Sequence, residues 1–119
     1  MTKHSKKLTI IIPVFNEKDT IKKIISKIIN LTNLKKEIIV VDDCSNDGTD
    51  KVLKNLKRNI NKLIVHKKNL GKGAAIRSAQ KFVKGDVVII QDADLEYDPK
   101  DYLKLLSQIQ RGYSVVYGS

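Results

Sequence analysis

The stretch VVIIQDAD, residues 87–94, joins an unbroken apolar run to two carboxylates one residue apart. Four consecutive apolar residues are typical of a strand that is covered on both faces of a parallel sheet. Asp92 and Asp94 leave this strand together, and like charges this close repel by about 4 kcal/mol at about 4 Å with an effective dielectric near 20. A cation such as Mg²⁺ or Mn²⁺, which binds one or two carboxylates plus phosphate oxygens, removes that repulsion. The pair predicts a metal held against a phosphorylated ligand, with a solvated acidic loop as the alternative.

Outward from this stretch, predicted strands alternate with predicted helices. Strands are expected at residues 8–14, 37–41, 63–65, 87–91 and 114–117, and helices around residues 21–29, 52–56 and 71–83 and from Pro99 onward. The helix over residues 71–83 is expected to turn its apolar side chains inward, namely Ile76, Ala79, Phe82 and Val83. Alternation of this kind predicts an α/β fold with a mostly parallel sheet and helices on both faces.

Polar residues follow three of these strands at the point where each strand ends. They are Asn16-Glu17, Asp42-Asp43 and Asp92-Asp94. In an open α/β sheet, ligands bind beyond the carboxyl ends of the strands, where the strand order reverses. With a strand order of 3-2-1-4, all three acidic groups are expected to converge at that edge.

Composition limits the function classes. The 119 residues predict one domain, and the single cysteine, Cys44, excludes an internal disulfide and suggests a reducing compartment. The formal net charge of +10 is compatible with anionic partners, but few aromatic residues are interleaved, so a nucleic-acid surface is poorly supported. No apolar stretch reaches the length that crosses a bilayer, and residues 1–7 form a basic tail without the features of a signal peptide.

Several polar residues also have purely structural explanations. Glu17 can complement a helix N-terminus, Asn16 or Asp19 can cap the first helix, and Asp42, Asp43 or Asp47 can cap a turn or helix. The segment Gly71-Lys72-Gly73 is too short for a P-loop, although Lys72 can supply a cation at a helix start that already favours anions. His4 and His66 lack partners at metal-ligand spacing and are expected to be structural or solvated.

Four segments in order carry a family resemblance. They are IIIPVFNE at residues 10–17, VVDDCSNDGT at 40–49, NLGKG at 69–73 and QDADLE at 91–96. In order and spacing they closely resemble family 2 glycosyltransferases of the GT-A fold, nearest to the polyprenyl-phosphate (dolichyl-phosphate) hexose synthases. The resemblance extends from Leu8 to the end of the chain. It implies a Rossmann-like nucleotide-binding half, an acceptor-binding half after it, and transfer of a hexose from a UDP- or GDP-linked sugar.

The resemblance also implies roles for individual residues. Residues expected to line the nucleoside pocket are Pro13, Phe15, Glu17, Val41 and Asp43. Asp92 and Asp94 correspond to the metal and sugar-nucleotide motif, Ala93 to a backbone contact with the nucleotide, and Glu96 to a further metal ligand in some members. The implied cofactor is Mg²⁺ or Mn²⁺, and Lys72 completes the expected nucleotide-sugar site.

The family pattern continues past Ser119, so residues 8–119 are expected to be the N-terminal, donor-binding half of a longer enzyme. The implied acceptor is a polyprenyl phosphate at the cytoplasmic face of a membrane, which needs no catalytic base because a phosphate is already ionised. No catalytic residue and no oligomeric state can be assigned from these residues. The alternatives are a non-catalytic receiver-like signalling module, a haloacid dehalogenase-like phosphatase, and a basic nucleic-acid-binding module.

Overall fold

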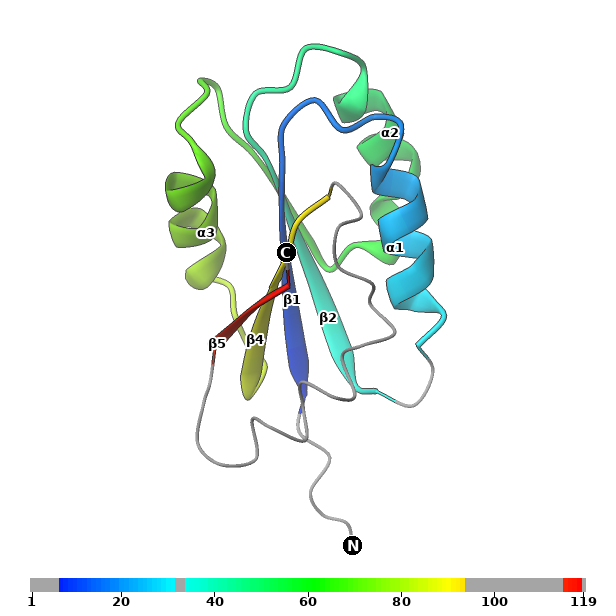
Figure 1. Ribbon diagram of the computed structural model, residues 1–119, viewed down its shortest axis with the longest axis vertical. Helices are drawn as coiled ribbons and strands as arrows, with labels where there is room; N and C mark the ends of the chain where they lie inside the picture. Colours follow the sequence, from blue (N-terminus) through cyan, green and yellow to red (C-terminus); the bar gives the residue numbers. More distant parts are fainter. Residues whose placement is uncertain (1–6, 32–33, 94–114, 119) are drawn as a thin grey trace, which may run out of the picture.

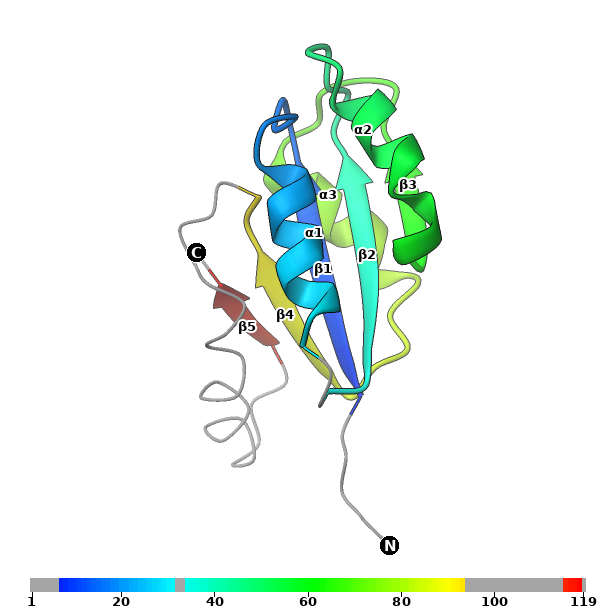
Figure 2. The same cartoon turned by 90° about the vertical axis from the view of Figure 1, so that its right-hand side faces the viewer.

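The computed structural model describes residues 7–31, 34–93 and 115–118. Five strands form one parallel sheet with the order β3-β2-β1-β4-β5. Figure 1 shows β2, β1, β4 and β5 side by side, and Figure 2 also labels β3, next to β2. Their bounds are β1 Leu8–Val14, β2 Lys36–Asp42, β3 Lys62–Val65, β4 Val87–Gln91 and β5 Val115–Gly118. The predicted strands and the predicted order 3-2-1-4 are confirmed, with β5 added beside β4.

The central strand, β1, pairs unequally with its two neighbours. Its pairing with β2 runs from Leu8 to Val14, whereas its pairing with β4 ends at Ile11. Pro13 has no N–H with which to extend a ladder, so the chain can diverge from β4 at this point. The strand order reverses at β1, and the carboxyl ends of β1 and β4 therefore open a gap at one edge of the sheet.

Helices cover both faces of the sheet. Figure 1 shows α1 (Ile21–Ile29) and α2 (Thr49–Asn55) on one side and α3 (Lys72–Gln80) on the other. Figure 2 looks onto α1 and α2, with α3 behind the sheet. A short 3₁₀ helix, η1 (Lys57–Asn59), follows α2.

Alternate residues of β1 build two separate cores. Ile10 and Ile12 belong to the cluster that contains the α1 side chains, while Ile11 packs with Ala75 and Ala79 of α3. Successive side chains of a strand point to opposite faces, so a strand covered on both sides must be apolar throughout. The isoleucine-rich run of β1 satisfies that requirement.

The helix α1 lies at the predicted residues and buries one apolar face, but it does not have the expected cap. Ile21, Ile24, Ile25 and Ile28 are fully buried. The N-cap is Thr20, and its side chain makes no capping hydrogen bond, so the assignment of Asn16 or Asp19 as the cap was wrong. Those two positions lie in the preceding loop, which is held by other contacts.

The helix α3 is shorter than predicted, and this changes which residues it buries. It ends at Gln80, so Phe82 lies beyond it and is 39% exposed, with the Lys62 ammonium 4.3 Å from the ring centre. The prediction that Phe82 points inward was therefore wrong. Ala75 and Ala79 are the fully buried residues of α3, because small side chains let the helix lie close to the sheet.

Some sequence predictions lie outside the described residues. They are the tail at residues 1–6, Asp94, Glu96, and the helix expected from Pro99. For β5, the structure describes the strand itself and its register with β4.

Gly85 packs tightly in the turn between α3 and β4, and this tight packing generates a stability prediction. Its N–H donates to Thr9 Oγ1 over 2.9 Å, and Thr9 in turn donates to the buried Glu37 carboxylate. A Cβ at Gly85 would meet Thr9 Oγ1 and would lie 2.8 Å from the Lys7 carbonyl oxygen. We expect Gly85→Ala to lower the free energy of unfolding by about 1–3 kcal/mol, the usual cost of overpacking.

The matched control is Gly73→Ala in α3. A Cβ there meets only the mobile end of Arg77, at 3.4 Å, and alanine is a better helix former than glycine. Urea unfolding should show Gly73→Ala at or above wild-type stability. Equal effects of the two substitutions would contradict the close packing at Gly85.

Candidate functional site

The loops that follow β1 and β2 are fastened to each other at the carboxyl edge of the sheet. Asn16, with a φ of 53°, receives a hydrogen bond at its side-chain oxygen from Asn46 N–H over 2.8 Å and donates its own N–H to Ser45 Oγ over 2.9 Å. Glu17 N–H donates to the buried Thr49 Oγ1 over 3.0 Å. These bonds hold both loops in one arrangement, which is what a preformed ligand site requires.

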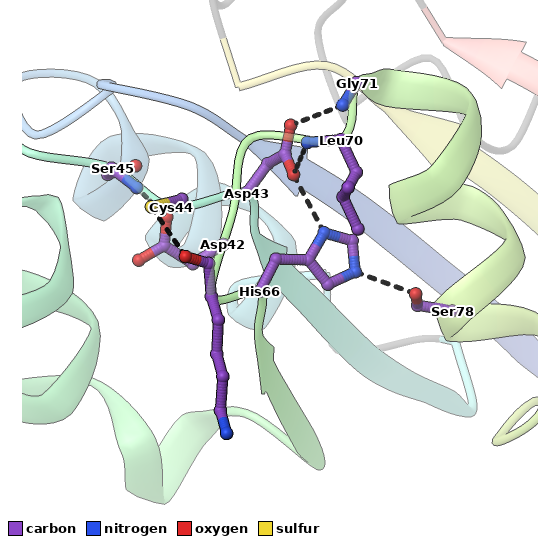
Figure 3. A network of polar contacts seen from close by, with 9 residues as sticks. Asp42, Asp43, Cys44, Ser45, His66, Leu70, Gly71 and Ser78 are labelled. Carbon is purple, nitrogen blue, oxygen red and sulfur yellow. Dashed lines mark hydrogen bonds and ion pairs between the residues drawn. The ribbon is translucent and has the colours of Figure 1, made fainter.

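The adjacent Asp42 and Asp43 have different roles. Asp42 is 1% exposed and accepts the N–H of Ser45 over 3.0 Å, which stabilises the turn after β2. Asp43 faces the other way, toward the start of α3 (Figure 3). Of the two carboxylates that the sequence offered as turn caps, Asp42 is therefore the one that serves the turn of its own loop.

Asp43 is the centre of a buried polar network, drawn in Figure 3. Its Oδ1 lies 2.8 Å from His66 Nδ1 and accepts the N–H of Leu70 over 2.9 Å, while Oδ2 accepts the N–H of Gly71 over 2.8 Å. Burial opposes ionisation, but the donors at Leu70, His66 and Gly71 hold the pKa of the Asp43 carboxyl below its usual 3.8. The group is therefore a fixed negative charge at neutral pH.

Lys72 and Asp92 meet across the mouth of the site. Lys72, the first residue of α3, places Nζ 2.6 Å from Asp92 Oδ1, just after β4. The Lys72 side chain is 48% exposed and that of Asp92 is 17% exposed. So exposed an ion pair contributes about 1 kcal/mol or less to stability. Its significance is electrostatic, because it shows that a positive charge is accommodated against Asp92.

Thr20 ties the loop after β4 to the start of α1. Its Oγ1 lies 2.5 Å from the carbonyl oxygen of Ala93 and 2.9 Å from Glu17 Oε2. Ala93 itself is 3% exposed, and its side chain packs in the larger core cluster. The segment that carries Asp92 is thus fixed to the loop after β1.

These elements enclose a pocket of about 180 Å³ at the gap between β1 and β4. Its lining comprises Pro13, Val14, Phe15, Glu17, Asp43, Lys72, Ala75 and Asp92. Six residues that the sequence nominated therefore gather around one cavity. Val41 is fully buried in the core beside Ala75, and neither Val41 nor Ala93 is among the lining residues, so their predicted nucleotide contacts stay predictions.

Residues 9–119 match the sequence profile of the family described as Glycosyl transferase family 2. The chain belongs to this family. Among its curated relatives, a dolichol-phosphate mannosyltransferase of Pyrococcus furiosus is 36% identical over 115 residues, which cover 95% of this chain and 33% of the relative. An undecaprenyl-phosphate 4-deoxy-4-formamido-L-arabinose transferase of Proteus mirabilis is 33% identical over 116 residues, which cover 92% of this chain and 36% of the relative.

Solved structures show that the fold is the one the resemblance implied, GT-A. The mannosyltransferase PcManGT from Pyrobaculum calidifontis, in complex with GDP-Man and Mn²⁺, superposes with a TM-score of 0.75 at 27% identity. The aligned region covers 84% of this chain and 31% of that one. The chain thus spans about a third of the length of these family 2 relatives, and it corresponds to their N-terminal part.

The alternatives raised from the sequence gain no support. Receiver modules have the strand order 2-1-3-4-5, whereas this glycosyltransferase-family sheet runs 3-2-1-4-5.

No helix among residues 7–31 and 34–93 is long and apolar enough to cross a bilayer.

Within the described region, this family 2 site offers only part of the ligand set that an oxygen-liganded cation needs. Asp92 is a hard carboxylate ligand beside the pocket, and its contact with Lys72 shows that a cation is favoured there. Over the described part of the chain, no three His, Cys, Asp or Glu side chains form a metal-binding group. Asp94 and Glu96, the other predicted ligands, lie outside that part.

Sequence reasoning missed His66 and Ser78 as contributors to the site. His66 was expected to be structural or solvated, and it is 9% exposed, with Nε2 2.8 Å from Ser78 Oγ on α3. A signal was present in the sequence. His66 follows β3 just as Asp43 follows β2, and the register pairs Asp42 with Val65, so both residues emerge at the same edge.

The lowered pKa values predict how stability depends on pH. Partial burial of Asp47 opposes its ionisation, yet hydrogen bonds from Thr49 and from the Lys18 N–H hold its pKa, like that of Asp43, below 3.8. A carboxyl with a depressed folded-state pKa stabilises the fold above its unfolded pKa, and this contribution disappears as the pH falls through the folded value. The free energy of unfolding should therefore be nearly flat above about pH 5 and should decline below about pH 4.

Asp43→Asn and Asp47→Asn should each lower stability at pH 7 and make the decline below about pH 4 shallower. The two sites belong to separate contact networks, so the double variant should combine both effects. Urea unfolding between pH 3 and pH 7 measures this. Curves for the variants that run parallel to the wild-type curve would contradict the assignment.

Proposed function

We propose that residues 8–119 are the donor-binding half of a glycosyltransferase that moves a hexose from a UDP- or GDP-linked sugar to a polyprenyl phosphate. The observation that supports this most strongly is the gathering of Phe15, Asp43, Lys72 and Asp92 around one pocket at the topological switch point. An apolar ring, a fixed carboxylate, an ammonium group and a second carboxylate are the groups that a nucleotide diphosphate sugar with a divalent cation would need.

Phe15 and Asp43 suit the nucleoside end of the donor. Phe15 is 44% exposed although it is a large apolar residue, and it offers a flat apolar surface at the pocket. A carboxylate accepts hydrogen bonds from a base N–H or a ribose hydroxyl, whereas phosphate oxygens have no proton to donate at neutral pH. Asp43 would therefore select the nucleoside rather than the diphosphate, with Pro13 and Glu17 completing the wall.

Lys72 and Asp92 suit the diphosphate end. Lys72 brings an ammonium group to the N-terminus of α3, where the helix dipole already favours anions. A divalent cation held by Asp92 would neutralise the diphosphate and make the nucleoside diphosphate a better leaving group. Mn²⁺ and GDP-Man bound to PcManGT support this arrangement, and Mg²⁺ is a second candidate. Asp94, Glu96 and the Ala93 backbone stay predicted contributors.

The acceptor is proposed from the relatives. The mannosyltransferase of Pyrococcus furiosus is named for dolichol phosphate and the Proteus mirabilis transferase for undecaprenyl phosphate. Both acceptors are membrane lipids, so the complete protein would work at the cytoplasmic face of a membrane. A lipid phosphate is an ionised nucleophile, so the donor half would not need to supply a base.

Donor binding is the direct test of this proposal. UDP or GDP at millimolar concentration with MnCl₂ should raise the melting temperature of the chain, because a ligand that binds only the native state stabilises it by mass action. Asp92→Asn should abolish most of the Mn²⁺-dependent part of this shift, since it removes a charged ligand. Asp50→Asn, in the first turn of α2 and away from the pocket lining, is the control and should keep the full shift. Folded protein that binds neither nucleotide by calorimetry would refute the proposal.

Sugar transfer tests the division of labour between the two halves. We expect the 119-residue chain to bind donor but to form no glycolipid with polyprenyl phosphate in detergent, because acceptor positioning supplies several kcal/mol of barrier lowering. A longer chain that includes an acceptor-binding half should form the product from labelled nucleotide sugar. Robust glycolipid formation by the short chain would place the acceptor site within these residues instead.

A further inference from the structure

His66 occupies an unusual place for a residue without an assigned role. It directly follows β3, is 9% exposed, and both ring nitrogens have partners on other segments. Nδ1 faces Asp43 after β2, and Nε2 faces Ser78 in the last turn of α3, as Figure 3 shows. Any buried imidazole needs hydrogen-bond partners, so the identity of these partners, and above all of Asp43, is what links His66 to the pocket.

The chemistry of Asp43 determines the tautomer of His66. An ionised carboxylate only accepts hydrogen bonds, so the proton of a neutral imidazole must sit on Nδ1. Nε2 then carries the lone pair and accepts the hydroxyl proton of Ser78. The ring is thus oriented from both sides.

His66 also decides how much of Asp43 is left for a ligand. A carboxylate has about four acceptor positions, two on each oxygen. His66 and the Leu70 N–H use both positions on Oδ1, and the Gly71 N–H uses one on Oδ2. With partners counted among the described residues alone, one acceptor position is left on Oδ2 of Asp43, a residue that lines the pocket.

The same bonds reach the phosphate end of the pocket. Asp43 accepts the N–H groups of Leu70 and Gly71. Gly71 has a φ of 94°, a backbone conformation that residues other than glycine rarely adopt. Gly71 is the N-cap of α3, so its position sets the origin of Lys72 and of the contact between Lys72 and Asp92. A rotation of the Asp43 carboxylate would disturb both ends of the pocket.

We propose that His66 is a positioning residue of the nucleotide pocket, which fixes the Asp43 carboxylate and through it the Leu70–Gly71 turn. The ligand in this inference rests on the proposed function, but the effect on Asp43 and the turn does not. His66 touches no lining residue other than Asp43 among the contacts described, so it acts through that carboxylate.

Asparagine and glutamine separate the two contacts of the ring. The side-chain amide nitrogen introduced by His66→Asn would lie near the place of Nδ1 and keep the donor to Asp43, whereas His66→Gln reaches the place of Nε2 and keeps the contact with Ser78. Each variant retains one of two buried hydrogen bonds, so their losses of stability should be similar. A purely structural role predicts equal behaviour, and a positioning role predicts that only His66→Gln harms the pocket.

The experiment uses the full 119-residue chain in two measurements. Titration calorimetry with UDP and with GDP, each with MnCl₂, gives the affinity, and amide hydrogen exchange by NMR gives the protection of Leu70 and Gly71. We expect His66→Gln to weaken nucleotide binding about ten- to hundredfold and to speed exchange at both amides by a similar factor, the scale of one lost hydrogen bond to a charged group. His66→Asn and Ser78→Ala, the matched controls, should stay within about twofold of wild type, because both keep the donor to Asp43.

The possible failures are distinguishable. Equal affinity and equal exchange in His66→Asn and His66→Gln would overturn the inference, as would faster exchange in His66→Gln with unchanged affinity. A wild-type chain that is folded but binds neither nucleotide would refute the proposed function. The exchange ratio between the two variants would then still decide whether His66 positions Asp43 and the turn. Long-range ¹H–¹⁵N spectra that show Nδ1 without a proton would contradict the inference as well.

Discussion

The parallel pairing of β1 with β2 on one side and with β4 on the other is the constraint on which the rest of the structure depends. It places the carboxyl ends of three strands at one edge, and it makes β1 the strand where the order reverses. Both faces of this sheet are covered by helices, so the strands themselves are apolar and polar chemistry is displaced to the loops. The early end of the β1–β4 pairing at Ile11, two residues before Pro13, opens the space that the pocket occupies.

The electrostatics of this edge contrast with those of the chain as a whole. The chain carries a formal net charge of +10, yet the pocket contains Glu17, Asp43 and Asp92. Asp43 and Asp92 are stabilised in different ways. Asp43 is held by three N–H donors from buried or half-buried groups, and Asp92 by the exposed Lys72 ammonium. The first arrangement is held from several sides, while the second depends on one half-exposed ammonium group that can change partner.

Sequence patterns predicted element type better than element limits. The run of isoleucines in β1 and the helical spacing of Ile21 to Ile28 left little choice, because burial on these faces requires apolar residues at those periods. Phe82 failed because periodicity alone cannot show where a helix stops, and α3 ends two residues before it. The prediction of Asn16 or Asp19 as the N-cap of α1 failed for a related reason, and the cap is Thr20. The loop after β1 is held by Ser45, Asn46 and Thr49 from a distant segment, which local sequence does not show.

The sequence by itself determined the α/β class and most of the candidate site, because alternating periods and short motifs after strands are local properties. The family resemblance pointed to Asp43 rather than the adjacent Asp42, but only the tertiary structure gives the physical reason. Asp42 and Asp43 carry the same side chain, but they have different partners. The turn with a φ of 65° at Cys44 brings the Ser45 N–H to Asp42, whereas Leu70 N–H donates to Asp43. The tertiary structure also gave His66 its partners, because a hydrogen bond between residues 23 positions apart depends on the register of β2 against β3, which no local pattern encodes.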